Sequence, residues 1–207
     1  MYFSGHGTAH KDHFYLIPHD LGYQGSRTAL DAEGLRQILA HSVSDTELEE
    51  VLRSVDADQM LLVIDACNSG QALEATEKRR GPMNTKGLAQ LAYEKGMYVL
   101  TASQSMEVAF ESEALKHSYL TYALIEEGIK GGSADLDSDG EVLLREWFDY
   151  AAGRVPQLGR QKKRVGKQLE ESDPDEVRVQ RPRMFYSRDA GAQRLVIARF
   201  SNARGQQ

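Results

Sequence analysis

Short apolar runs alternate with longer amphipathic stretches along this chain. Continuous apolar runs at 60–64 (MLLVI) and 98–101 (YVLT) are typical of strands that are buried on both faces of a sheet. Shorter runs at 1–4 (MYFS), 14–17 (FYLI) and 195–198 (LVIA) predict further strands. Because strands alternate with helices, the pattern favours an α/β fold in which a mostly parallel sheet is flanked by helices on both faces.

The helices are predicted from apolar residues that recur every three or four positions. Four stretches carry such an apolar face: 35–39, 48–55, 118–129 and 147–151. Ser26, Thr28 or Asp31 is suited to cap the first of these helices. For the second helix, we expect the cap to be Asp45 or Thr46.

The overall composition predicts one folded domain. Of the 207 residues 41% are apolar, which is enough to build a single hydrophobic core. Residues 160–178 are dense in charge and almost free of large apolar groups, so they predict an exposed loop. The net charge of -6 argues against general nucleic-acid binding, which usually requires a basic face. No stretch approaches the ~18 consecutive apolar residues of a membrane span.

Cys67 is the single cysteine of the chain, so no internal disulfide can form and a reducing compartment is expected. The N-terminal residues also lack the basic and apolar regions of a secretion signal. We therefore expect a cytoplasmic protein. The simplest role for a lone cysteine is a buried structural thiol.

A catalytic role for Cys67 needs a base and a set of hydrogen-bond donors, and the sequence supplies candidates for both. His6 lies between Gly5 and Gly7, which allow the backbone to come close to a substrate. His6 and Cys67 each fall just past a predicted strand end, where parallel strands of a sheet place their ligand sites. The N–H groups of Gly7 and Cys67 are candidate donors to an oxyanion. This pattern predicts a cysteine nucleophile that is activated by a histidine.

Two sequence motifs carry a resemblance to a known family. Residues 2–7 (YFSGHG) resemble the histidine motif of the caspase and metacaspase superfamily, and residues 62–70 (LVIDACNSG) resemble its cysteine motif. The cysteine motif has the metacaspase-type form Asp-x-Cys-x-Ser-Gly. The resemblance implies a caspase-like cysteine endopeptidase domain over 1–200, followed by a polar tail at 201–207. His6 and Cys67 would form its catalytic dyad, and the chemistry would require no cofactor. The alternative is an inactive caspase-like scaffold, or a calcium-responsive interaction module.

The residue two positions before the nucleophile predicts the substrate preference. Asp65 shares a strand face with Cys67, and a carboxylate there would attract a cationic side chain. Resemblance to metacaspases implies that Asp65 and Ser4 contribute to a pocket that selects Arg or Lys at P1. Ser103 follows another strand end and is a further candidate for this pocket. The alternatives are a turn or helix-cap carboxylate for Asp65 and a loop serine for Ser103.

A basic stretch follows the cysteine motif. Residues 78–80 (KRR) lie in a polar segment that is broken by Gly and Pro, so a loop is expected. Such a run is usually a solvated surface loop. It also resembles the predicted substrate, and we therefore predict that the protein cleaves itself after Arg79 or Arg80.

Residues 135–146 match a second motif, the EF-hand-like calcium loop D-x-D-x-D-G-x5-E. Its hard oxygen donors suit Ca²⁺ better than Mg²⁺. Gly140 would supply the tight turn, and Glu141 would bind through its backbone carbonyl. The alternative is an acidic turn without a functional metal site. The predicted metal ligands are Asp135, Asp137, Asp139, Glu141 and Glu146.

The resemblance also implies elements that precede the histidine motif. A caspase-like sheet normally begins with two further strands and a helix, whereas this chain begins inside the histidine strand. We therefore expect the first strands to be missing and the histidine strand to be an exposed apolar edge. The expected partners are protein or peptide substrates with Arg or Lys at P1, with no nucleic acid and no membrane.

Overall fold

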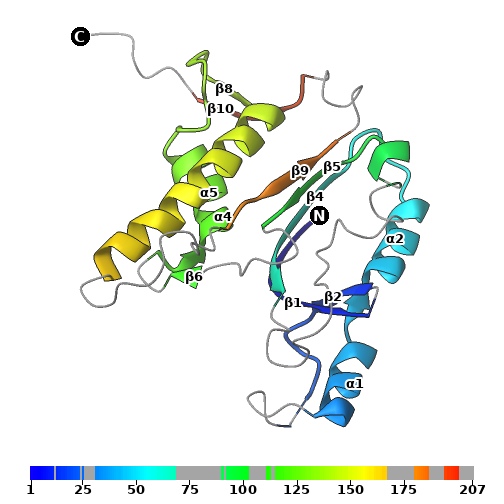
Figure 1. The fold of residues 1–207 in the computed structure, drawn as a ribbon. Coiled ribbons are helices and arrows are strands. Elements are labelled where there is room, and N and C mark those ends of the chain that lie inside the picture. The colour runs from blue at the N-terminus through cyan, green and yellow to red at the C-terminus, as the bar shows by residue number, and fades with distance from the viewer. Residues whose placement is uncertain are drawn as a thin grey trace.

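A mixed sheet with helices on both faces forms the centre of the protein (Figure 1). The computed structural model describes residues 1–11, 13–23, 25, 31–68, 90, 92–102, 111–112, 115–166, 180–186 and 194–200. Within these residues the main sheet has six strands in the order β3-β2-β1-β4-β5-β9. Its strands are β1 (Tyr2–His10), β2 (His13–Ile17), β3 (Val43–Ser44), β4 (Leu61–Asn68), β5 (Tyr98–Thr101) and β9 (Arg183–Phe185).

The three central strands of this sheet are parallel. β1 pairs with β4, and β4 pairs with β5, both in parallel register, whereas β2, β3 and β9 are added in antiparallel orientation. The predicted α/β class is therefore confirmed, and the parallel part of the sheet is its centre. Strand β9 was not predicted, because its three residues carry no long apolar run.

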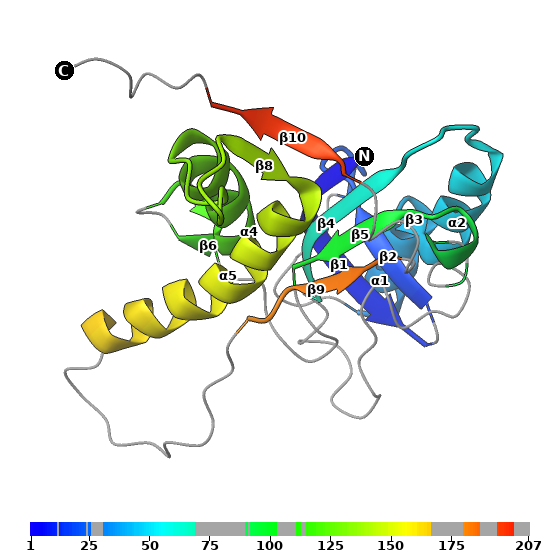
Figure 2. The ribbon, with the colours of Figure 1, turned by 90° about the horizontal axis from the view of Figure 1, so that it is seen from above.

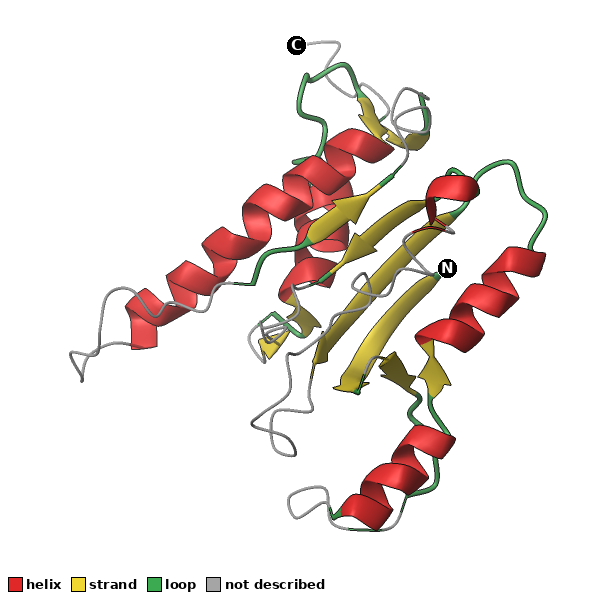
Figure 3. Ribbon diagram, turned by 45° about the vertical axis from the view of Figure 1, so that its right-hand side comes forward, coloured by secondary structure: helices red, strands yellow, loops and turns green. Residues whose placement is uncertain are grey.

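Helices cover the two faces of the sheet separately (Figure 3). Helices α1 (Ala32–Ala40) and α2 (Asp45–Ser54) lie on one side. On the other side α4 (Tyr119–Thr121) continues into a π-helix, η2 (Tyr122–Lys130), which packs beside α5 (Leu144–Gly166). Among the described helices, none has both the length and the apolar character needed to cross a membrane.

The alternation of side chains along β4 divides the core into two parts. Leu62 and Ile64 point to the α2 side, where they pack with residues such as Leu48 and Phe14. Val63 points to the opposite side and packs among residues of α4, η2 and α5. The side chains of both clusters have little exposed surface. Each fully buried Val, Leu, Ile, Phe or Met side chain contributes about 1.5–3 kcal/mol to folding.

Two small antiparallel pairings lie outside the main sheet. β8 (Glu141–Leu143) pairs with β10 (Val196–Arg199), and β6 (Glu111–Ser112) pairs with β7 (His117–Ser118). The strand predicted at 195–198 is thus present as β10, but it lies against β8 and not in the main sheet (Figure 2).

The predicted strand ends at His6 and Cys67 are wrong, because both residues lie within strands. β1 continues through His6 to His10, since β2 folds back and supplies partners for that half of the strand. β4 likewise continues through Cys67 to Asn68. The glycines beside His6 therefore do not end the strand.

The first half of β1 is an edge, as expected for part of the histidine strand. Residues 2–5 pair with β4 alone, and no other described strand pairs with them on the opposite side. Met1 and Tyr2 are 57% and 45% exposed. The second half of β1 is covered by β2, so the expectation of an exposed edge is confirmed only for the N-terminal half.

The helix boundaries differ from the prediction at two points. Asp31 caps α1 as expected, but α2 is capped by Ser44, whose hydroxyl forms a capping box with Glu47. Asp45 cannot serve as the cap because it is turned into the protein, where its carboxylate accepts the Phe14 N–H at 2.9 Å. Helix α5 also runs to Gly166, so residues 160–166 are helical and not part of a loop.

We predict that Ser44→Ala lowers the free energy of unfolding by about 1 kcal/mol, because it removes the N-cap of α2. Urea denaturation followed by circular dichroism measures this change. Ser54→Ala, at an exposed position at the other end of the same helix, is the matched control and is expected to stay within about 0.5 kcal/mol of the parent protein. An equal effect of both substitutions would contradict the role assigned to Ser44.

Candidate active site

The backbones of His6 and Cys67 lie side by side on adjacent parallel strands. His6 is the register partner of Cys67, and Ser4 is the register partner of Asp65. Neighbouring strands of a sheet are about 4.8 Å apart, so the two predicted catalytic residues occupy adjacent positions. The His6 side chain is exposed. The side chain of Cys67 lies outside what the structure describes.

One face of β1 and β4 carries the polar residues that the sequence singled out. Tyr2, Ser4 and His6 alternate along β1 and therefore share a face, and all three are exposed. On β4 the same face carries Val63 and Asp65, and the helices α4 and η2 pack over it. The site is thus formed by two central strands and the start of the α4–η2 helix.

Asp65 is buried in this face, with 3% of its surface exposed. Its Oδ2 accepts hydrogen bonds from the hydroxyls of Ser118, Thr121 and Tyr2, of which the bond from Tyr2 is the longest at 3.4 Å. Its Oδ1 is also buried, and it has no hydrogen-bond partner among the described residues. The carboxylate therefore has one oxygen with several donors and one oxygen with none.

Burial and hydrogen bonding act on Asp65 in opposite directions. Burial raises the pKa of the Asp65 carboxyl above its usual value, while the hydroxyls of Ser118, Thr121 and Tyr2 oppose this rise. The pKa of Tyr2 is raised to about 12, first by desolvation of its hydroxyl and then by the negative charge of Asp65.

The alternative interpretation of Asp65 as a turn or helix-cap residue does not match its position. Asp65 lies inside β4, four residues after the strand begins. The N-cap of α4 is Ser118, whose Oγ accepts the Thr121 N–H at 3.1 Å. Asp65 is thus a strand residue that contacts the cap.

The structure describes the other predicted site residues to different extents. Gly7 is buried between two strands, with Leu16 of β2 and Asn68 of β4 as its register partners. Its predicted role as an oxyanion donor stays a prediction. Ser103 and the basic stretch at 78–80 lie outside the described residues.

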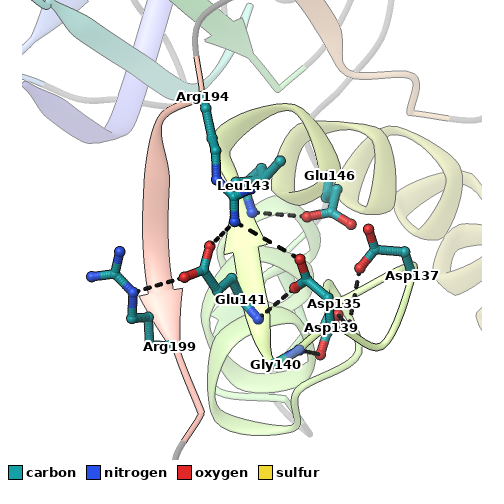
Figure 4. Close-up of polar contacts among 9 residues, drawn as sticks. All are labelled: Asp135, Asp137, Asp139, Gly140, Glu141, Leu143, Glu146, Arg194 and Arg199. Carbon is teal, nitrogen blue, oxygen red and sulfur yellow. Dashed lines mark hydrogen bonds and ion pairs between the residues drawn. The ribbon is translucent and has the colours of Figure 1, made fainter.

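The EF-hand-like loop brings three of its predicted ligands together (Figure 4). Asp135, Asp137 and Asp139 each offer a carboxylate oxygen, and these oxygens lie within 4.8 Å of one another. The expected tight turn is present at Gly140, where φ is +89°. The loop lies between the helices η2 and α5.

Backbone N–H groups orient the carboxylates of this loop. The Gly140 N–H donates to Asp135 Oδ2 at 3.0 Å, and the Glu141 N–H donates to Asp139 Oδ1 at 2.8 Å. Glu146 lies outside the group of three and accepts the Leu143 N–H at 2.8 Å.

The side chain of Glu141 contacts two arginines: Arg194, which precedes β10, and Arg199, which is its last residue. Its carboxylate pairs with Arg194 and with Arg199, whose Nε lies at 2.9 Å (Figure 4). These bonds lower the pKa of the Glu141 carboxyl, with Arg194 as the larger cause. Arg194 also approaches Asp139 to 3.9 Å, so part of the negative charge of the loop is balanced within the chain.

Sequence reasoning missed the three hydroxyl residues around Asp65. Tyr2 carries a weak signal, because it is two positions before Ser4 and therefore shares its strand face. Ser118 precedes an apolar helical pattern, which indicates a helix cap but not a contact with Asp65. The contact itself depends on how α4 packs against the sheet.

Comparison with known proteins gives one match. The family model described as "Caspase domain" matches residues 1–172. Searches of curated proteins and of solved structures found no match. The matched segment covers most of the chain and includes β1, β4 and the helices that pack over them. The chain therefore belongs to the caspase-domain family of cysteine-type peptidases.

Proposed function

We propose that this protein is a cysteine endopeptidase that uses His6 and Cys67 and cleaves peptide bonds after Arg or Lys. The observation that carries the proposal is the register of β1 and β4, in which His6 and Cys67 are direct partners. Family membership supports peptidase chemistry in general.

The proposed reaction is acyl transfer in two steps. The Cys67 thiolate attacks the peptide carbonyl, and collapse of the tetrahedral intermediate breaks the C–N bond and forms a thioester. His6 gives a proton to the leaving amine and then takes one from the water that hydrolyses the thioester. The N–H groups of Gly7 and Cys67 are the proposed donors to the oxyanion. No cofactor takes part in these steps.

The preference for a basic P1 residue is supported by the charge and burial of Asp65. A buried carboxylate with an oxygen that lacks a donor is a strong acceptor for a guanidinium or an ammonium group. Ser4 is the register neighbour of Asp65 and is exposed, so it lies where a substrate side chain would approach. Ser103 remains the third proposed pocket residue.

We predict that the purified protein cleaves fluorogenic peptides with Arg or Lys at P1 and leaves the matched Asp peptide uncleaved. Cys67→Ala is expected to abolish cleavage, because the nucleophile is lost, and His6→Ala is expected to lower kcat by at least about 100-fold. Labelling of Cys67 by an Arg-containing acyloxymethyl ketone checks the same site by mass spectrometry. Preference for Asp would contradict the proposal. An intact fold without cleavage or labelling would favour the non-catalytic scaffold.

We also propose that the EF-hand-like loop binds Ca²⁺ and that binding raises the activity. The three aspartates that lie within 4.8 Å of one another support this proposal. The pairing of β8 with β10 adds support, because it fixes the second half of the loop against another strand. Glu146 would have to turn from the Leu143 N–H to act as a ligand.

Calorimetric titration with Ca²⁺ is expected to show one binding event that is lost in Asp135→Ala. Arg194→Ala is expected to bind Ca²⁺ more tightly, by up to about fivefold, because it removes a competing cation from Asp139 and Glu141. Arg36→Ala removes an exposed arginine far from the loop in sequence, and it is the matched control. Absence of binding below millimolar Ca²⁺ would contradict the proposal.

Self-cleavage after Arg79 or Arg80 is expected when the protein is active. Intact-mass analysis of the purified protein should then show two fragments, while Cys67→Ala should give the full-length mass. A double Arg79→Gln, Arg80→Gln variant is expected to stay intact but to cleave the Arg peptide. Identical full-length masses for the active protein and Cys67→Ala would contradict self-cleavage in this loop.

A further inference from the structure

We propose that Tyr2, Ser118 and Thr121 are positioning residues for substrate recognition, and that their hydroxyls orient the Asp65 carboxylate so that its Oδ1 is left for the cationic side chain of the substrate. We call these three residues the hydroxyl cradle. The inference rests on the proposed function and names residues of the specificity pocket beyond Ser4, Asp65 and Ser103.

The hydroxyl cradle converges on a single oxygen. All three hydroxyls contact Asp65 Oδ2, and the Tyr2 hydroxyl also contacts Thr121 Oγ1. These contacts come from β1 and from the start of the α4–η2 helix, so they join two elements that are far apart in sequence. A carboxylate that is bonded in this way at one oxygen has little freedom to rotate.

The direction of the hydrogen bonds follows from the N-cap of α4. Ser118 Oγ accepts the Thr121 N–H, which leaves the Ser118 hydroxyl proton free to point at Asp65. Thr121 donates its own hydroxyl proton to Asp65, so its Oγ1 can only accept from Tyr2. The single Tyr2 hydroxyl proton is therefore shared between Thr121 Oγ1 and Asp65 Oδ2. The cap therefore fixes the donors before any substrate arrives.

The cradle binds the carboxylate without neutralising it. Among the described residues no ion pair involves Asp65, and Tyr2 is the titratable group in contact with it. Ala102, which follows β5, donates its N–H to Ile64 O next to Asp65 and carries no charge. From α4 and its cap the carboxylate meets hydroxyls and the Thr121 backbone N–H. The next titratable residue on this face of β1 is His6, whose register partner is Cys67 and not Asp65. His117, which precedes the cap residue Ser118, pairs with Glu126 at 3.5 Å. No cation among the described residues thus competes with a cationic ligand for Asp65.

Asp65 Oδ1, which has no donor among the described residues, is the second observation that points to a ligand. A buried carboxylate oxygen without a donor costs folding free energy, so it needs an explanation, and a cationic ligand is the one we propose. Asp65 shares its strand face with Ser4 and His6, and both of these side chains are exposed. A substrate that lies along this exposed strip would bring its basic side chain beside the buried Asp65, and we propose that it reaches Oδ1 there.

The hydroxyl cradle also affects the pH range in which Asp65 is ionised. Burial raises the pKa of Asp65, and each hydroxyl bond opposes this rise because it stabilises the ionised form. Removal of a donor should therefore raise the pKa further. As the pH is lowered, a variant that lacks a donor would protonate Asp65 at a higher pH than the parent protein does. It would therefore lose its activity on a cationic substrate at that higher pH.

The test compares Thr121→Val, which removes the hydroxyl at nearly constant volume, with Thr121→Ser, which keeps it. Tyr2→Phe is a second variant that removes a donor. Each is assayed on an Arg peptide and on a matched norleucine peptide, across pH. Carbon-13 titration of the Asp65 carboxyl follows its pKa independently of activity.

Thr121→Val and Tyr2→Phe are expected to lower kcat/KM for the Arg peptide by about tenfold, and to leave the norleucine peptide within about twofold. The acid limb for the Arg peptide and the Asp65 titration should both shift to higher pH, while Thr121→Ser should resemble the parent protein. Equal losses on both peptides, or an unchanged Asp65 titration, would overturn the proposal. A parent protein that cleaves neither peptide would instead defeat the proposed function, and this proposal with it.

Discussion

The parallel pairing of β1 with β4 is the interaction on which the proposed chemistry depends. A shift of this pairing by one residue would turn every side chain of one strand to the other face, and it would separate His6 from Cys67 and Ser4 from Asp65. Val63 is buried on one side of β4, and Leu62 and Ile64 are buried on the other, so these apolar residues do not distinguish the two faces. Asp65 does distinguish them, because its carboxylate finds the Ser118 and Thr121 hydroxyls on the α4 side alone.

Asp65 shows how stability and recognition oppose each other in this site. A carboxylate with a raised pKa stabilises the fold most when it is protonated at low pH, and that contribution is lost as the pH rises through the folded-state pKa. Replacement of Asp65 by an amide would therefore favour the fold increasingly at neutral pH. We expect Asp65 to be retained because its charge would contribute to substrate binding, although the charge does not stabilise the fold.

Local patterns in the sequence were enough to place the central elements, since these depend on short-range chemistry. The strand at Tyr98–Thr101 has the predicted bounds because all four of its residues are buried. The extent of β1 could not be read in the same way, because its continuation past His6 depends on pairing with β2. The hydroxyl cradle also could not be predicted from the sequence. Tyr2 and Thr121 belong to common residue types, and only the packing of α4 on the sheet brings them to Asp65.

The pairing of β8 with β10 has a consequence for where this domain can be cut. The family match ends at residue 172, whereas β9 and β10 both come later in the chain. The later segment contributes Leu195 O to the Leu144 N–H, and its Phe200 N–H donates to Gly140 O. A protein trimmed to the matched residues would lose the last strand of the main sheet. It would also lose Arg194 and Arg199, which pair with Glu141 of the acidic loop. Strand β8 would then have an unpaired backbone edge that other chains could bind.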